Sequence, residues 1–180
     1  PASVMVKGDQ VALRDIAVFS QYEPEYKPLV EAIQGIIISD APAPKTKSVI
    51  LGAQVLEALE KSTLPIKAIG YSIPKAIAVE REGRAVTKDE IISALKNSMW
   101  EEKSLDLQVR DIEWTAEQII PVGITRVATE RLGKPNGGKM PVRTEIFVDD
   151  KAAARFLITA LVDDWREVPV PNRNLERGML

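Results

Sequence analysis

The sequence predicts an α+β fold built mostly from antiparallel β strands, with two short amphipathic helices. Three observations lead to this prediction. Long alternating runs flank a polar tip near the end of the chain, helical periodicity is confined to two stretches, and no strand–helix–strand rhythm of a parallel sheet recurs. With 180 residues, 45% of them hydrophobic and 28% charged, the chain can bury a sizeable core as a globular protein.

The longest strands are predicted at a hairpin around the polar tip at residues 149–151. Val142, Thr144, Ile146 and Val148 fall on one face before the tip, and alternation resumes after it over residues 156–162. Period-two alternation on both sides of a short polar turn is typical of an antiparallel hairpin. A ribbon of this length is not stable alone, so we expect earlier segments to pack against it.

The first forty residues predict short strands and a loop. Residues 3–6 and 11–13 alternate around Gly8 and Asp9, a pair that favours a tight turn, so we expect a small hairpin. Residues 20–28 carry two tyrosines and two prolines, which predicts a loop whose aromatic side chains cap a core, with a recognition surface as the alternative. Residues 35–38 are expected to form a buried strand, and the proline-rich residues 40–45 a connector.

The first predicted helix begins at Ser48, with apolar residues at three- and four-residue spacing as far as Leu59. Gly52 lies on the apolar face of this helix, which indicates close approach of a neighbouring backbone. Two strands are then expected at residues 66–71 and 75–80.

The second predicted helix has the clearest local signal in the chain. Thr87 and Glu90 have the spacing of a capping box, in which each residue binds the backbone amide of the other. One apolar stripe follows, and the helix is expected to end around Trp100; the stripe consists of Ile91, Ile92, Leu95 and Met99.

Three further segments lead into the hairpin. Residues 105–114 alternate but change parity, which predicts a bulge at Arg110 and Asp111. Residues 119–126 contain Pro121 and Gly123, which favour an edge strand or a corner. Residues 134–138 predict a turn.

Composition and motifs argue against several function classes. A net charge of −2 disfavours a nucleic-acid binder, and the absence of Cys and His excludes thiolate, zinc–cysteine and histidine-dependent chemistry. No apolar run approaches the ~18 residues that span a bilayer. The acidic pairs at residues 149–150 and 163–164 favour a solvated turn and a strand end over a metal site.

A basic stretch favours a solvated face, with an acidic partner surface as the alternative; it consists of Arg126, Arg131, Lys134, Lys139 and Arg143. No nucleophile with a base stands out, so the sequence predicts no catalytic residues, no metal site, no cofactor and no enzyme.

The last residues carry a resemblance to a known module. The segment VPVPNRNLERGML, at residues 168–180, resembles the opening of a SAF (β-clip) domain. The opening VMVKGDQVALRDIA, the capped second helix and the run from the hairpin into residue 168 are similar to the FlgA family of flagellar basal-body P-ring formation proteins. The resemblance covers nearly the whole chain, and its middle third matches in pattern more than in residues.

This resemblance implies a function. It implies a periplasmic assembly chaperone for the flagellar P ring, exported with a signal peptide that is later removed, that binds the P-ring subunit protein without catalysis or cofactor. Two alternatives are a SAF-type accessory that binds a sugar acid or another small ligand, and a pilus-assembly protein. SAF modules of the family continue beyond the equivalent of Leu180, so residues 168–180 correspond only to the start of that module.

The expected organisation follows from these observations. We expect an N-terminal β segment at residues 1–40, an α+β region at 41–167 that ends in the hairpin, and the incomplete SAF module at 168–180. Candidate partner surfaces are residues 119–127, the edge of the long hairpin, and residues 173–180. The predicted hinge consists of Val168, Pro169, Val170, Pro171 and Asn172. The predicted partner-binding residues are Arg173, Leu175, Arg177, Gly178 and Leu180.

Overall fold

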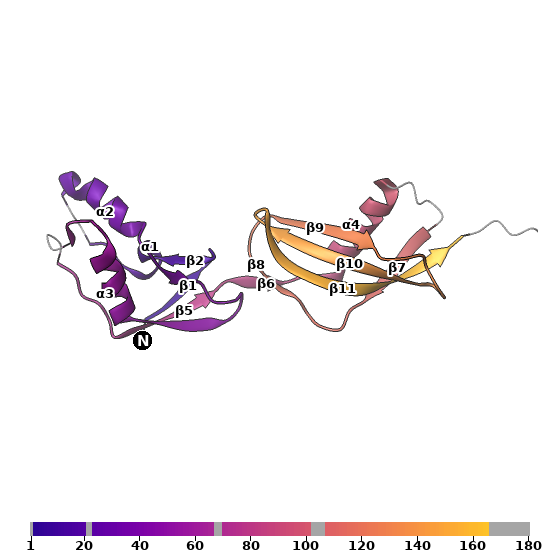
Figure 1. Ribbon diagram of the computed structural model, residues 1–180, viewed down its shortest axis with the longest axis horizontal. Coiled ribbons are helices and arrows are strands. Elements are labelled where there is room, and N and C mark those ends of the chain that lie inside the picture. The colour runs from indigo at the N-terminus through magenta and orange to yellow at the C-terminus, as the bar shows by residue number, and fades with distance from the viewer. Residues whose placement is uncertain (1, 21–22, 67–69, 102–106, 166–180) are drawn as a thin grey trace, which may run out of the picture. The chain divides into compact units, whose positions relative to one another are not determined.

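The computed structural model describes residues 2–20, 23–66, 70–101 and 107–165 (Figure 1). The chain divides into two compact units. Unit 1 comprises Pro1–Val86, Glu117–Thr125 and Val148–Ala153, and unit 2 comprises Thr87–Ala116, Arg126–Phe147 and Ala154–Leu180. The predicted α+β class with mostly antiparallel strands is confirmed, with four α-helices among the described residues where two were expected. The bounds of these two units differ from those of the segments expected from the sequence, which are residues 1–40, 41–167 and 168–180.

Unit 1 contains a three-stranded sheet in the order β1-β5-β4, formed by β1 (Ala2–Val6), β5 (Ala76–Arg81) and β4 (Lys47–Leu51). β1 runs parallel to β5, with Val4 opposite Val79, and β4 is antiparallel to β5, with Ile50 opposite Ile77. Val6, Ile50, Ile77 and Val79 are buried on the inner face, where each such side chain contributes about 1.5–3 kcal/mol of hydrophobic stabilisation.

The predicted hairpin of the first two strands is wrong. β2 (Gln10–Ala12) pairs instead with β3 (Ile37–Asp40), with Val11 opposite Ser39. A two-stranded hairpin could not bury both apolar runs, whereas separate partners let Val6 and Val11 enter one core. β3 is also less buried than predicted, because Ile37 is 46% exposed.

The helices of unit 1 depart furthest from the prediction. α1 (Leu13–Ile16), a short 3₁₀ turn (Pro24–Tyr26) and α2 (Lys27–Gln34) lie in a region where the sequence predicts a strand, a loop and no helix. Pro28 fits in α2 because the first turn of a helix needs no amide donors. Val30 and Ile33 point inward from α2 and are almost fully buried.

α3 (Gly52–Lys61) begins four residues later than predicted, because Ser48 and Val49 lie in β4. The amide of Leu51 donates to Gln54 Oε1 at 2.8 Å, which satisfies one of the free donors at the start of the helix. The close approach expected at Gly52 is confirmed, since a Cβ there would lie 2.3 Å from the carbonyl oxygen of Pro74. The strand predicted at residues 75–80 is confirmed as β5. Of the strand predicted at residues 66–71, Gly70 and Tyr71 are not in a strand, and residues 67–69 lie outside the described residues.

The core of unit 1 joins both sheets to α1, α2 and α3. Its buried members are Val6, Val11, Leu13, Ile33, Ile50, Val55, Leu59, Ile77 and Val79. Unit 1 also includes the two-stranded ladder of β6 (Gly83–Ala85) and β8 (Ile119–Pro121), with Gly83 opposite Pro121.

Unit 2 contains a four-stranded sheet in the order β7-β11-β10-β9. Its strands are β7 (Leu107–Glu113), β9 (Thr125–Arg131), β10 (Lys139–Val148) and β11 (Lys151–Asp164). β10 and β11, the strands on either side of the predicted polar tip, are the two central strands (Figure 1). The predicted inner face is confirmed, and its buried residues include Val142, Thr144, Ile146, Ile158, Ala160 and Val162.

Turns and irregularities in this sheet also follow the sequence. The tip residues Asp149 and Asp150 both have positive φ, 49° and 62°, which suits a two-residue hairpin turn. The predicted bulge is confirmed: Leu161 lies opposite Asp111 and Val162 opposite Val109, so the register skips Arg110.

α4 (Lys88–Glu101) packs against β7 and carries the predicted capping box. The Thr87 amide donates to Glu90 Oε2 at 2.9 Å, and the Glu90 amide donates to Thr87 Oγ1 at 3.3 Å. Ile91, Leu95 and Met99 are buried, as the apolar stripe predicts.

Candidate partner-binding surfaces

The residues predicted for the hinge and for partner binding all lie in 166–180, outside the described residues. They are Val168, Pro169, Val170, Pro171, Asn172, Arg173, Leu175, Arg177, Gly178 and Leu180. Their roles stay predictions. The other two predicted surfaces can be placed.

The edge of the long hairpin is not a free edge, so this prediction is wrong. β10 is bonded to β9 and β11 to β7, because the hairpin lies in the middle of the four-stranded sheet. Among the described strands, β9 and β7 form the edges of that sheet instead. The sequence shows which residues alternate, but neighbouring strands in a sheet are set by contacts between distant segments.

The segment at residues 119–127 contains a paired strand, β8, and an exposed corner that follows it. Ile120 in β8 is fully buried, whereas Val122 is 38% exposed and Ile124 is 83% exposed. The Ile124 amide donates to Asp149 Oδ1 at 3.0 Å, and the Asp149 amide donates to the Ile124 carbonyl at 2.9 Å. The corner therefore fixes the hairpin tip, and Asp149 has a structural role.

Charged side chains on different strands of unit 2 are paired with one another. Arg143 lies 2.6 Å from Glu130, Arg110 3.1 Å from Asp163 and Lys139 3.2 Å from Glu113, and Arg155 also pairs with Glu145. The Arg126 guanidinium lies 4.1 Å over the ring of Phe147. These contacts favour the solvated-face interpretation of the basic stretch, because most of its charges already have local partners. Exposed pairs of this kind contribute about 0–1 kcal/mol each.

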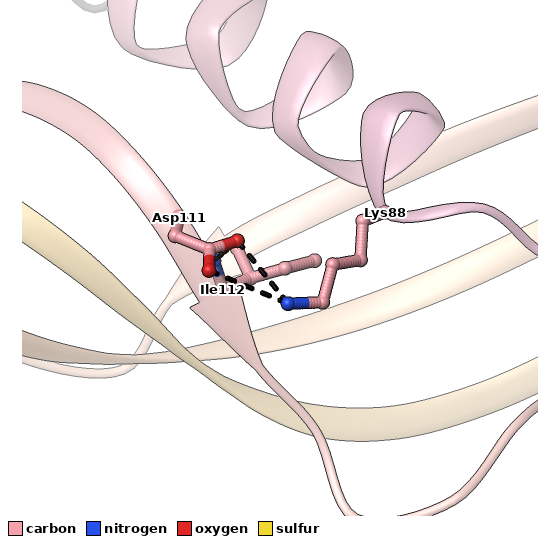
Figure 2. A network of polar contacts seen from close by, with 3 residues as sticks. All are labelled: Lys88, Asp111 and Ile112. Carbon is pink, nitrogen blue, oxygen red and sulfur yellow. Dashed lines mark hydrogen bonds and ion pairs between the residues drawn. The ribbon is translucent and has the colours of Figure 1, made fainter.

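Figure 2 shows a smaller polar network between α4 and β7. Lys88, at the first position of α4, lies 3.3 Å from both carboxylate oxygens of Asp111, and the Ile112 amide donates to Asp111 Oδ1 at 2.8 Å. The hydrogen bond from the Ile112 amide lowers the pKa of Asp111 below its ordinary value, and the hydrogen bond from Lys88 lowers it further by a smaller amount. The network explains how the bulge is held beside the start of α4.

The outer face of the unit 1 sheet is apolar and uncovered. Opposite the buried inner face, the strand register places Val49 beside Ala78 and Leu51 beside Ala76. Val49 is 59% exposed, Leu51 is 53% exposed, and Met5 on β1 is 62% exposed. Among the described residues of this face, Lys47 lies 3.2 Å from Glu80, and Glu80 is also opposite Met5 in the strand register. We call Met5, Val49, Leu51, Ala76 and Ala78 the outer apolar face.

A cavity of about 730 Å³ lies on the helical side of unit 1. α1, α2 and α3 contribute Leu13, Val30, Ile33, Val55 and Leu59 to its walls. The segment from Gly70 to Pro74 forms another wall, and Val18, Phe19 and Tyr26 complete it. No charged residue lines the cavity among the described residues.

Neither of these surfaces is predicted from the sequence. Val49 was placed in a helix, although residues 47–51 alternate and could have been recognised as a strand. Tyr26 was expected to cap a core, whereas it lines the cavity and is 43% exposed. The cavity itself depends on α2, for which the sequence gives no helix prediction: the predicted loop covers residues 20–28 and the next predicted strand begins at residue 35.

Comparison of the chain with protein families, curated proteins and solved structures finds no match. Within the described ranges, no three acidic side chains gather as metal ligands. Of the helices in those ranges, none has the length and apolar content needed to cross a bilayer.

Proposed function

We propose that this protein is a periplasmic assembly chaperone for the flagellar P ring, which holds P-ring subunits by protein–protein contacts. The sequence resemblance to the P-ring formation family supplies the identity of the partner. The observation that carries the binding role is the outer apolar face of unit 1, where Met5, Val49 and Leu51 each expose more than half of their surface.

An apolar sheet face of this kind is suited to transient binding of another polypeptide. Contiguous exposed apolar side chains on a soluble protein commonly mark interaction sites. β4 is also an edge strand of the described sheet, so its backbone is available for pairing with an extended segment. Unit 2 offers a contrast, since charge pairs join its strands.

The test uses the full-length protein with the double substitution Val49→Glu and Leu51→Glu. Both side chains are largely exposed, so the fold should tolerate the change. Carboxylates placed in an apolar interface cost more than the lost hydrophobic contact, so binding of the purified P-ring subunit should weaken at least about tenfold. Swimming motility should fall in parallel when the variant replaces the wild-type gene.

Leu157→Glu is the matched control, because Leu157 is 65% exposed on β11 of unit 2 and does not belong to the outer apolar face. It should bind the subunit as the wild type does. A wild-type protein that fails to bind the subunit would refute the proposed function. Binding by the double variant at wild-type strength would show that the outer apolar face is not the site.

A further inference from the structure

The cavity of unit 1 has the size of a binding pocket. Its volume of about 730 Å³ lies within the range of about 300–1,000 Å³ that is typical of ligand sites. Its floor is formed by side chains that also belong to the core, among them Leu13, Val55 and Leu59. The floor is therefore held by the same packing that holds the fold.

The chemistry of the lining restricts what can bind there. The described lining residues are aliphatic or aromatic apart from two serines, the hydroxyls of two tyrosines and backbone groups, and none is charged. A phosphate or carboxylate head group would need a cationic or strongly donating partner, which these residues do not offer. The lining therefore suits uncharged, apolar groups.

The rim of the cavity indicates how large the occupant is. Val18 is 98% exposed, Tyr71 is 54% exposed and Tyr26 is 43% exposed, although all three line the cavity. A small molecule confined to the cavity would leave most of this apolar rim in water. A polypeptide segment could fill the cavity with its side chains and also cover the rim. The tyrosine hydroxyls at the rim can bond to the peptide groups of such a segment.

We propose that this cavity receives large apolar side chains from a segment of the P-ring subunit and anchors that segment. This inference rests on the proposed function and adds a second, deeper contact to the outer apolar face. The buried floor gives the anchor a fixed shape, and the rim binds the flanking backbone. Deep apolar anchors surrounded by a partly exposed rim are the usual arrangement where a few residues dominate affinity.

The experiment places the photo-crosslinker p-benzoylphenylalanine at position 71 of the full-length protein and irradiates it with purified P-ring subunit. The control carries the same crosslinker at position 60, because Glu60 is exposed on α3 and does not line the cavity. Position 71 should crosslink to an apolar stretch of the subunit, identified by mass spectrometry, and position 60 should not.

A second pair of variants tests the cavity without disturbing its floor. Ser72 lines the cavity at an exposed position, so Ser72→Arg puts a charge at the mouth, whereas Ser72→Ala does not. Ser72→Arg should weaken subunit binding at least about tenfold and Ser72→Ala should leave it unchanged. Native mass spectrometry of the purified protein checks for a bound small apolar molecule.

The outcomes separate the two proposals. If wild-type protein binds the subunit, but position 71 gives no crosslink and Ser72→Arg binds normally, the cavity inference is wrong and the proposed function stands. If the cavity holds a small molecule that the subunit does not displace, the inference is also wrong. If wild-type protein does not bind the subunit at all, the proposed function fails and takes the inference with it.

Discussion

Replacing Gly52 with alanine tests the packing that positions the cavity wall. A Cβ at this position would lie 2.3 Å from the carbonyl oxygen of Pro74 and 3.1 Å from Cγ2 of Ile73. The nearer contact is to backbone, so no side-chain rotation can relieve it. The Gly52 amide also donates to the Lys75 carbonyl at 3.0 Å, and this bond must lengthen if the 73–75 segment moves away.

The expected loss of stability follows from opposing terms. Alanine in place of glycine favours a helix by up to about 1 kcal/mol. Overpacking of this kind typically costs about 1–3 kcal/mol, and a weakened backbone hydrogen bond costs about 0.5–1.5 kcal/mol more. We therefore expect Gly52→Ala to lower the free energy of unfolding by about 1–3 kcal/mol. For a domain of roughly 100 residues this is a fall in Tm of at least about 4 °C.

Urea and thermal unfolding followed by far-UV circular dichroism measure the effect. Gly133→Ala is the matched control, because no heavy atom lies within 4 Å of a Cβ at that position and its φ is not positive. It should be neutral or stabilising by up to about 1 kcal/mol. Gly52→Ala with wild-type stability would refute the account of the α3 contact with the 73–75 segment.

Three further predictions concern unit 2. Thr87→Ala removes the reciprocal cap of α4 and should lower the free energy of unfolding by about 1 kcal/mol, measured by urea unfolding with tryptophan fluorescence; an unchanged midpoint would contradict the cap. Thr144→Val removes a fully buried hydroxyl that has no hydrogen-bond partner among the described residues, so it should stabilise by about 0.5–1 kcal/mol, and a loss of stability in the same assay would show that the hydroxyl is satisfied. The folded-state pKa of Asp111 lies below its ordinary value of 3.8, so the contribution of this carboxylate to stability is present above that pH and is lost as the pH falls through the folded-state pKa. The difference in free energy of unfolding between wild type and Asp111→Asn should therefore shrink in acid. A difference that is independent of pH would contradict this prediction.

Local sequence signals were enough to predict several elements. The capping box of Thr87 and Glu90, the bulge at Arg110 and the close contact at Gly52 each depend on residues whose type restricts the backbone around them. The buried face of the hairpin was predictable for a similar reason, since a strand that is buried on one side must alternate.

Pairing between distant segments could not be predicted in the same way. β1 pairs with β5, more than seventy positions further along the chain, and nothing in residues 2–6 distinguishes that partner from the nearby strand β2. α2 is not predicted either, because the prolines and tyrosines of residues 20–28 favour a loop and only two buried residues of α2, Val30 and Ile33, mark its apolar side. The outer apolar face and the cavity both follow from these arrangements, which is why neither was foreseen.

The most direct test of binding through apolar surface is calorimetric titration of the full-length protein with purified P-ring subunit at several temperatures. We predict saturable binding with a negative heat-capacity change, because burial of apolar surface gives that sign. The magnitude of this heat-capacity change should be smaller for the double variant Val49→Glu and Leu51→Glu. No binding, or binding with a heat-capacity change near zero that is the same in the variant, would contradict the proposal.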